Sequence, residues 1–221
     1  MTKGKGKLIV LEGTDGSGKK TQTKLLVERL RTAGRLVQTV DFPRYTQNFF
    51  GGVVRRYLDS EFGPATAVNP YLASIPYAAD RWESAAQLRQ WLRSGAVVVL
   101  DRYVSSNLIH QAAKLPEAQR PNFIAWLQQM EYSVFKVPRP NLTLYLHVPA
   151  TVAYQLVGSR GAGRDGHEAD LRHLHTAEAQ CRTLAAQLKW PTIECTRDER
   201  MRTPEDIAEE VWRAVHDYLN G

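Results

Sequence analysis

The stretch KLIVLEGTDGSGK, residues Lys7–Lys19, decides the fold. Its first half, up to Glu12, is a short apolar run with β-branched residues, which is typical of a strand buried on both faces of a parallel sheet. Its second half, Gly13–Lys19, matches the pattern GxxxxGK, and apolar side chains follow at helical spacing up to Gly34. A glycine-rich turn between a strand and a helix predicts a loop whose backbone N–H groups bind phosphate.

This loop predicts a nucleoside triphosphate as ligand. Its glycines let backbone N–H groups turn inward, the helix N-terminus adds partial positive charge, and the Lys19 ammonium can reach the β- and γ-phosphates. An incidental glycine-rich turn would explain neither the flanking elements nor the spacing. The residues expected to bind ATP are Gly13, Thr14, Asp15, Gly16, Ser17, Gly18, Lys19, Lys20 and Thr21.

Lys20 departs from the usual motif, in which a Ser or Thr follows the lysine and places its hydroxyl on Mg²⁺. Three alternatives stay open: Thr21 takes that position, water takes it, or Lys20 supplies charge that the metal otherwise would. A further metal-binding candidate is Asp101, at the end of a later strand, because a carboxylate there can hold Mg²⁺ through water.

Strands and helices alternate along the rest of the chain. The further strands are expected at Leu36–Phe42, Ala96–Leu100, Leu142–Val148 and Thr192–Thr196. Helices are expected at Gly51–Leu58, Pro70–Arg93 with an interruption near Pro76, Ser105–Ala113, Pro121–Phe135, from Thr151, Glu168–Lys189 and Thr203–Leu219. This alternation predicts a single α/β domain over residues 1–221, with a parallel sheet between two helical layers and ligands beyond the carboxyl ends of its strands.

Composition limits the partners. The chain has 29 Lys and Arg against 23 Asp and Glu, a net charge of +6, but the basic residues are scattered, which favours pockets for small phosphates over nucleic acid. The apolar run Leu8–Leu11 is too short for a signal-peptide core or a membrane span. Two cysteines without paired spacing predict neither a disulfide framework nor a zinc site. We therefore expect a cytoplasmic protein.

Two strands end in residues suited to phosphate. Asp101-Arg102-Tyr103 follows the third strand, where the planar Arg102 fork can bind a phosphate, although such a pair is often only a helix cap or a surface ion pair. Phe42-Pro43-Arg44-Tyr45 ends the second strand.

Two further candidates lie on a helix and in a loop. Tyr77 and Arg81, four residues apart on one helix face, suit a stacked and hydrogen-bonded nucleobase; core packing and a solvated arginine are the alternative. Arg160 and Arg164 flank glycines in the loop Ser159–Gly166, where mobile arginines could close over a transferring phosphoryl group; a basic surface turn is the alternative.

Five segments taken together resemble the thymidylate kinase family: EGTDGSGKKTQ from Glu12, FPRY from Phe42, YAADRWE from Tyr77, LDRYVSS from Leu100 and SRGAGRDGHEADL from Ser159. Their order and spacing match as well as their content, over nearly the whole chain. The resemblance implies that ATP and dTMP give ADP and dTDP with Mg²⁺, on a five-stranded parallel sheet, in a homodimer packed through helices.

The resemblance also implies roles for individual residues. Asp15 would contact the sugar or phosphate of the acceptor, Arg44 and Arg102 its phosphate, Tyr77 and Arg81 its base, and Tyr103 the sugar 2′ position. Phe42 joins the substrate-binding set, and Lys19, Asp101, Arg102, Arg160 and Arg164 form the catalytic set. Because Thr14–Ser17 contains no basic residue, the chain resembles the type whose extra arginines lie in a lid, here at about 159–167. FPRY places its arginine one residue earlier than the usual FPxR.

Other functions remain as alternatives. A deoxynucleoside kinase shares the fold but needs a carboxylate near the second strand to deprotonate a sugar hydroxyl, whereas Phe42-Pro43-Arg44 offers a cation. Another pyrimidine nucleoside monophosphate kinase would use the same elements. A phosphate-loop regulator or a nucleic-acid-binding ATPase would need a water-positioning residue and usually a larger assembly surface.

Overall fold

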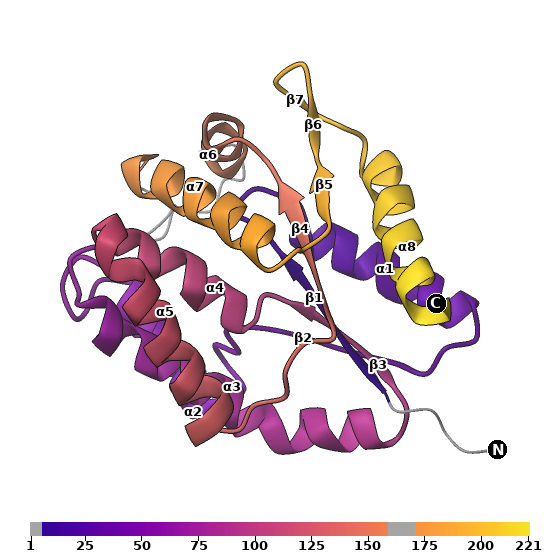
Figure 1. The fold of residues 1–221 in the computed structure, drawn as a ribbon, viewed down its shortest axis with the longest axis horizontal. Helices are drawn as coiled ribbons and strands as arrows, with labels where there is room; N and C mark the ends of the chain where they lie inside the picture. The colour runs from indigo at the N-terminus through magenta and orange to yellow at the C-terminus, as the bar shows by residue number, and fades with distance from the viewer. Residues whose placement is uncertain (1–5, 159–170) are drawn as a thin grey trace.

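The computed structural model describes residues 6–158 and 171–221. At its centre lies a five-stranded parallel sheet in the order β2-β3-β1-β4-β5 (Figure 1). The strands are β1 Lys7–Glu12, β2 Val37–Asp41, β3 Val97–Asp101, β4 Leu142–His147 and β5 Thr192–Glu194. The predicted fold class is thereby confirmed. Every β1 residue from Leu8 to Glu12 is buried, as expected for a strand covered on both faces.

Helices cover both faces of the sheet (Figure 1). On one face, α1 and α8 pack side by side over a core that includes Ile9, Val99 and Leu146. On the other face, a core that includes Val98 and Leu100 is enclosed by α3, α4, α5 and α7. The helices are α1 Lys19–Thr32, α2 Phe49–Leu58, α3 Pro70–Arg93, α4 Val104–His110, α5 Arg120–Gln129, α6 Ala150–Gly158, α7 Leu171–Gln187 and α8 Pro204–Asn220.

The predicted interruption of the long helix near Pro76 is wrong. Helix α3 runs without a break from Pro70 to Arg93. Proline removes one N–H donor but keeps a φ close to the helical value, so a helix that is well packed on both sides can continue through it. Ala73 precedes the proline and Ala78 follows it, and both are buried in the core. Tertiary packing outweighs the local penalty here.

Three further details differ from the expected elements. The predicted helix over Pro121–Phe135 is α-helical only to Gln129 and continues as a π-helical turn, Met130–Val134. Short 3₁₀ turns occur at Ala112–Lys114 and Glu117–Gln119, and a small antiparallel hairpin pairs β6 Thr196–Arg197 with β7 Arg200–Met201.

Within the described part of the chain, no helix is long and apolar enough to cross a membrane.

The strand register brings the carboxyl ends of β1, β2 and β3 together. Asp101 of β3 pairs with Leu11 of β1 on one side and with Asp41 of β2 on the other. Glu12, the last residue of β1, pairs with Tyr145 of β4. Because parallel strands end at the same edge, the loops that follow β1, β2 and β3 meet there, as the sequence predicted for ligand binding.

Candidate active site

The predicted phosphate loop connects β1 to α1, and Lys19 folds back over it. The Lys19 ammonium donates to the carbonyl oxygens of Gly13 at 3.0 Å and Thr14 at 2.8 Å, and the side chain is buried. Burial lowers the pKa of Lys19, and the neighbouring Arg102 charge lowers it further. The ammonium is therefore held inside the loop, where phosphate oxygens of a nucleotide could replace the carbonyl oxygens as acceptors.

Two glycines of the loop have physical reasons to be glycine. A Cβ atom on Gly13 would lie 2.6 Å from the carbonyl oxygen of Leu146 and 2.7 Å from the Ser17 hydroxyl. Gly16 has a φ of +86°, and a Cβ there would lie 2.9 Å from the carbonyl oxygen of Ala153. A side chain at either position would push the loop away from β4 or α6, so both glycines keep the loop close to the sheet.

Glu12 is a site residue that the sequence analysis missed. Its side chain is fully buried, and its carboxylate accepts hydrogen bonds from the Ser105 hydroxyl at 2.5 Å, the Ser106 hydroxyl at 2.9 Å and the Gly13 N–H at 3.0 Å. One carboxylate oxygen lies 3.9 Å from the Arg102 guanidinium. A charged residue that ends an otherwise apolar strand was the signal available in the sequence, because a buried charge needs partners.

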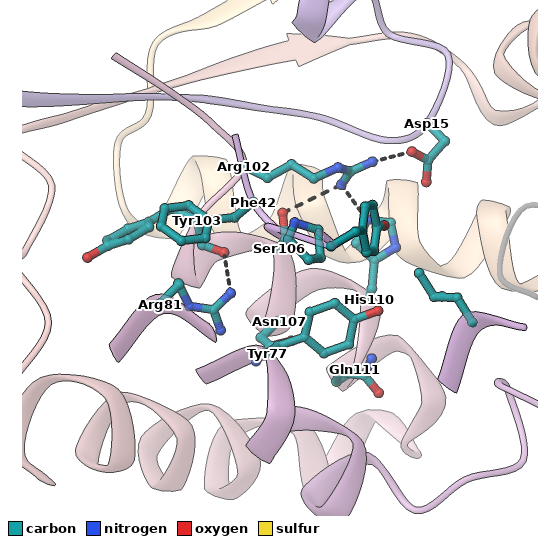
Figure 2. A pocket seen from close by; sticks show the side chains of 13 residues that line it. Asp15, Phe42, Tyr77, Arg81, Arg102, Tyr103, Ser106, Asn107, His110 and Gln111 are labelled. Atoms are coloured by element: carbon teal, nitrogen blue, oxygen red, sulfur yellow. Dashed lines mark hydrogen bonds and ion pairs between the residues drawn. The ribbon is translucent and has the colours of Figure 1, made fainter. Parts of the chain in front are cut away.

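Arg102 connects the phosphate loop to the helix that follows β3. Its guanidinium forms an ion pair with Asp15, contacts the Ser106 hydroxyl at 3.5 Å and lies 3.3 Å from Nε2 of His110 (Figure 2). Its φ of 66° lies in the left-handed region, which is unfavourable for a non-glycine residue. Residues in such strained conformations cluster at functional sites. This backbone conformation accompanies a side chain that lies against the loop.

The electrostatics of this pair favour both charges. Burial by itself raises the pKa of Asp15, but the Arg102 and Lys19 charges outweigh burial and hold that pKa well below its usual range. Burial likewise lowers the pKa of Arg102, and the Asp15 and Glu12 carboxylates more than reverse it. The ionised Asp15 carboxylate thus pairs with the Arg102 guanidinium in this structure, as a phosphate could in a complex.

A pocket opens beside Arg102 (Figure 2). Six residues predicted to bind substrate line it, which are Asp15, Phe42, Tyr77, Arg81, Arg102 and Tyr103. Seven residues that the sequence analysis did not select line it too: Pro43, Tyr45, Leu58, Ser106, Asn107, His110 and Gln111. Four of these follow Tyr103 at helical spacing, three, four, seven and eight residues later. One face of a helix that begins at a predicted site residue was therefore the signal that could have found them.

Tyr103 and Arg81 enter the pocket from positions that are otherwise buried. The Tyr103 hydroxyl donates to the carbonyl oxygen of Pro138 at 3.0 Å, and its ring centroid lies 5.7 Å from that of Phe42. The Arg81 side chain is only 2% exposed and is paired with Glu131. Tyr77 packs edge-on against Tyr57, with ring centroids 6.0 Å apart.

Other predicted residues lie apart from this pocket. The Arg44 guanidinium donates to the Ser84 hydroxyl at 3.2 Å, and Arg44 is not among the pocket-lining residues. Lys20 and Asp101 line a second groove, between α1 and the ends of β2 and β3, together with Asp41. Thr21 is exposed and does not line that groove. Arg160 and Arg164, with the predicted lid at about 159–167, lie outside the described residues.

Asp101 fits a role in holding Mg²⁺. Burial raises the pKa of its carboxyl, partly offset by the Lys19 and Arg102 charges, so a nearby cation would favour the ionised form. Over residues 6–158 and 171–221, no group of three or more His, Cys, Asp or Glu side chains is placed to hold a metal ion. Mg²⁺ does not need such a cage when it arrives with nucleotide phosphates, because one or two carboxylates and water complete its shell.

Proteins of one known family are similar to this chain. The family model described as thymidylate kinase matches residues 11–203. The thymidylate kinase of Mycobacterium tuberculosis is 35% identical over 185 residues, which cover 81% of this chain and 86% of the relative. The human thymidylate kinase is 31% identical over 169 residues, covering 76% of this chain and 70% of the relative.

A solved structure shares the fold. The thymidylate kinase of Candida albicans, whose structure is described as revealing the origin of broad substrate specificity, superposes with a TM-score of 0.76. The match covers 98% of this chain and 93% of the other at 22% sequence identity. At that identity, the likeness concerns the arrangement of helices and strands.

Lys114 supports the pocket wall from behind. Its ammonium donates to the carbonyl oxygen of Ala65 at 2.9 Å, to Gln111 Oε1 at 3.2 Å and to the Tyr57 hydroxyl at 3.3 Å. Among these partners, Gln111 lines the pocket. Among the described residues no carboxylate offsets the loss of water, and burial lowers the pKa of Lys114 to about 8.

We predict that Lys114 makes the free energy of unfolding depend on pH in the alkaline range. A lysine in the unfolded chain has a pKa of about 10.4. Between pH about 8 and about 10.4 the unfolded chain therefore binds more protons at this residue than the folded chain, so wild-type stability should rise relative to Lys114→Met. Because Lys114 is partly exposed, we expect a relative gain on the order of 1 kcal/mol.

Urea unfolding of the wild type and of Lys114→Met at several pH values from 7 to 10 measures this difference. Lys24→Met, which removes an exposed lysine, is the control for the loss of one positive charge. If the difference in unfolding free energy between the wild type and Lys114→Met stays constant over this range, the lowered pKa of Lys114 is contradicted.

Proposed function

Because the chain belongs to the thymidylate kinase family of ATP-dependent phosphotransferases, we propose that it transfers the γ-phosphoryl group of ATP to dTMP. The bond between the γ-phosphorus and the β–γ bridging oxygen breaks, a phosphate oxygen of dTMP bonds to that phosphorus, and ADP and dTDP leave. The observation that carries this proposal is the position of Asp15, which belongs to the phosphate loop and also lines the pocket through its pairing with Arg102.

Base selection is assigned to Tyr77 and Arg81. Both line the pocket, and Tyr77 supplies a ring on which a pyrimidine can stack. Arg81 offers only donors, which suits a thymine carbonyl and leaves a cytosine amino group facing another donor. The buried Tyr103 ring adds a steric limit beside the sugar, in favour of deoxyribose.

Phosphate binding is assigned to Arg102, with Lys19 on the ATP side. The acceptor phosphate would replace Asp15 as partner of the Arg102 guanidinium, and the Lys19 ammonium would exchange the loop carbonyls for β- and γ-oxygens. Asp101 is the carboxylate that would hold Mg²⁺, and the ion would supply positive charge that offsets the negative charge on the transferring group. The roles of Arg44, Arg160 and Arg164 stay predictions, as does a cytoplasmic location.

We predict that dTMP is the preferred acceptor. ADP formation from ATP should depend on dTMP and be at least roughly tenfold lower in kcat/KM with dCMP, because the wrong base leaves buried donors unpaired. A panel of dTMP, dUMP, dCMP, dGMP, ribothymidine monophosphate and thymidine, with a no-acceptor control, measures this. Turnover of dCMP equal to dTMP would contradict the assignment of Arg81, and turnover of thymidine alone would identify a deoxynucleoside kinase.

We predict that Asp101→Asn raises the Mg²⁺ concentration needed for half-maximal activity. The amide lacks the negative charge that attracts the hydrated ion, while its shape is nearly unchanged. Titrating Mg²⁺ at fixed ATP and dTMP measures the effect, and Asp59→Asn, at an exposed ion pair with Arg55, is the control. Full wild-type activity in excess chelator would overturn the metal role and would favour Lys20 as the substitute cation.

We also propose a homodimer packed through α3. Leu72, Ile75 and Trp82 of this helix are 64%, 41% and 52% exposed, and their spacings of three and seven residues place them along one side of it. Phe49 at the start of α2 lies beside this strip, since its N–H contacts the Glu83 carboxylate, and is 75% exposed. Large apolar side chains gathered on a surface are typical of an interaction site.

We predict that Trp82→Glu weakens self-association. Sedimentation equilibrium should give the wild type about twice the monomer mass of 25.0 kDa, and the variant should shift toward the monomer because it places a charge in the apolar interface. Leu188→Glu, at another exposed apolar residue near the end of α7, is the matched control and should leave the mass unchanged. A monomeric wild type at tens of micromolar would contradict the dimer.

A further inference from the structure

The π-helical turn after α5 supplies a buried carboxylate behind the pocket. Glu131 is fully buried, and it is not among the residues that line the pocket. The turn is wider than an α-helical one, as the N–H of Phe135 donates to the carbonyl oxygen of Met130 at 2.9 Å, five residues back. Such turns are rare and frequently occur at functional sites.

Glu131 binds one edge of the Arg81 guanidinium. Arg81 Nε lies 3.1 and 3.2 Å from the two carboxylate oxygens, and Nη2 pairs with one of them. On another edge, Nη1 donates to the carbonyl oxygen of Tyr103 at 3.3 Å (Figure 2). A two-point pairing of this kind fixes the plane of the guanidinium as well as its position.

The pairing determines which donors remain for a ligand. A guanidinium carries five N–H groups. Nε–H, one N–H of Nη2 and one N–H of Nη1 are taken by Glu131 and Tyr103, so two N–H groups remain without a partner among the described residues. Because Arg81 lines the pocket, these two groups are the donors it can offer to a bound base.

Electrostatics also favour this orientation. Burial lowers the pKa of Arg81, but the Glu131 carboxylate outweighs burial and raises it, so the guanidinium stays charged although only 2% of its residue surface is exposed. Without that carboxylate, the buried cation would lose the strongest of the charges that favour its ionised form.

The same segment fixes the second residue of the pocket wall. Beyond the π turn, the carbonyl oxygen of Pro138 accepts the Tyr103 hydroxyl at 3.0 Å. The carbonyl oxygen of Lys136 accepts a hydrogen bond at 2.9 Å from Arg89, which lies on α3 eight residues after Arg81. Residues 130–138 thus hold two pocket residues from outside the pocket.

We propose that Glu131 is a positioning residue, which sets the donor pattern of Arg81 and through it the choice of acceptor base. The acceptor is then selected partly by a side chain that does not touch it. This inference rests on the proposed function of the pocket as the dTMP site.

Glu131→Gln tests the proposal, because the amide keeps the size of the side chain and turns one acceptor into a donor that faces the guanidinium. We expect the KM for dTMP to rise about tenfold or more and the preference for dTMP over dCMP to fall by a similar factor. The KM for ATP should stay within about twofold. Glu131→Asp, which keeps the charge on a shorter side chain, should lie between the variant and the wild type.

Glu178→Gln is the matched control, since that largely buried carboxylate pairs with His147 away from the pocket. Thermal unfolding of each variant, together with calorimetric binding of dTMP, separates a folded variant from a damaged one. A folded Glu131→Gln variant with wild-type KM and base preference would overturn the proposal, as would a loss of kcat alone that Glu178→Gln reproduces. If the wild type itself does not phosphorylate dTMP, the proposed function fails instead.

Discussion

The arrangement of the site depends on one partly buried cation, Arg102. Its guanidinium meets Asp15 from the phosphate loop, Glu12 from the end of β1, and Ser106 and His110 from α4. The loop after β1 and the helix after β3 are therefore fixed relative to each other through charges rather than through apolar packing alone. Together with the hydrogen bonds from Ser105 and Ser106 to Glu12, the pairing of Arg102 with Asp15 joins the phosphate loop to the pocket.

The site also contains its own substitutes for phosphate. Asp15 satisfies Arg102, and the Gly13 and Thr14 carbonyls satisfy Lys19. Cations that would otherwise be buried without partners keep their charge in this way, and the cost of holding them in place is met by folding rather than by binding. In the complex that we propose, phosphate would exchange one set of oxygens for another, so its net gain in affinity would be smaller than the sum of its new contacts.

Local signals in the sequence predicted the fold, and together with the family resemblance they selected six of the thirteen residues that line the pocket. The β1 run, the glycine pattern and Lys19 form one continuous segment, so their geometry follows from chain direction. Glu12 and Glu131 were missed because their roles depend on partners far along the chain: Ser105 and Ser106 for one, Arg81 for the other. Pro76 was misread for the same reason, since its effect on α3 depends on packing that no local pattern encodes.

The π turn at Met130–Val134 constrains the number of residues between α5 and β4. A turn of this type contains one residue more than the α-helical turn it replaces. Removing one residue after Glu131 would shorten the segment between that carboxylate and Pro138. The carbonyl of Pro138 would then move away from Tyr103. Insertions and deletions in this stretch should accordingly be rarer in the lineage than amino-acid replacements, because the number of residues between α5 and β4 matters as much as their identity.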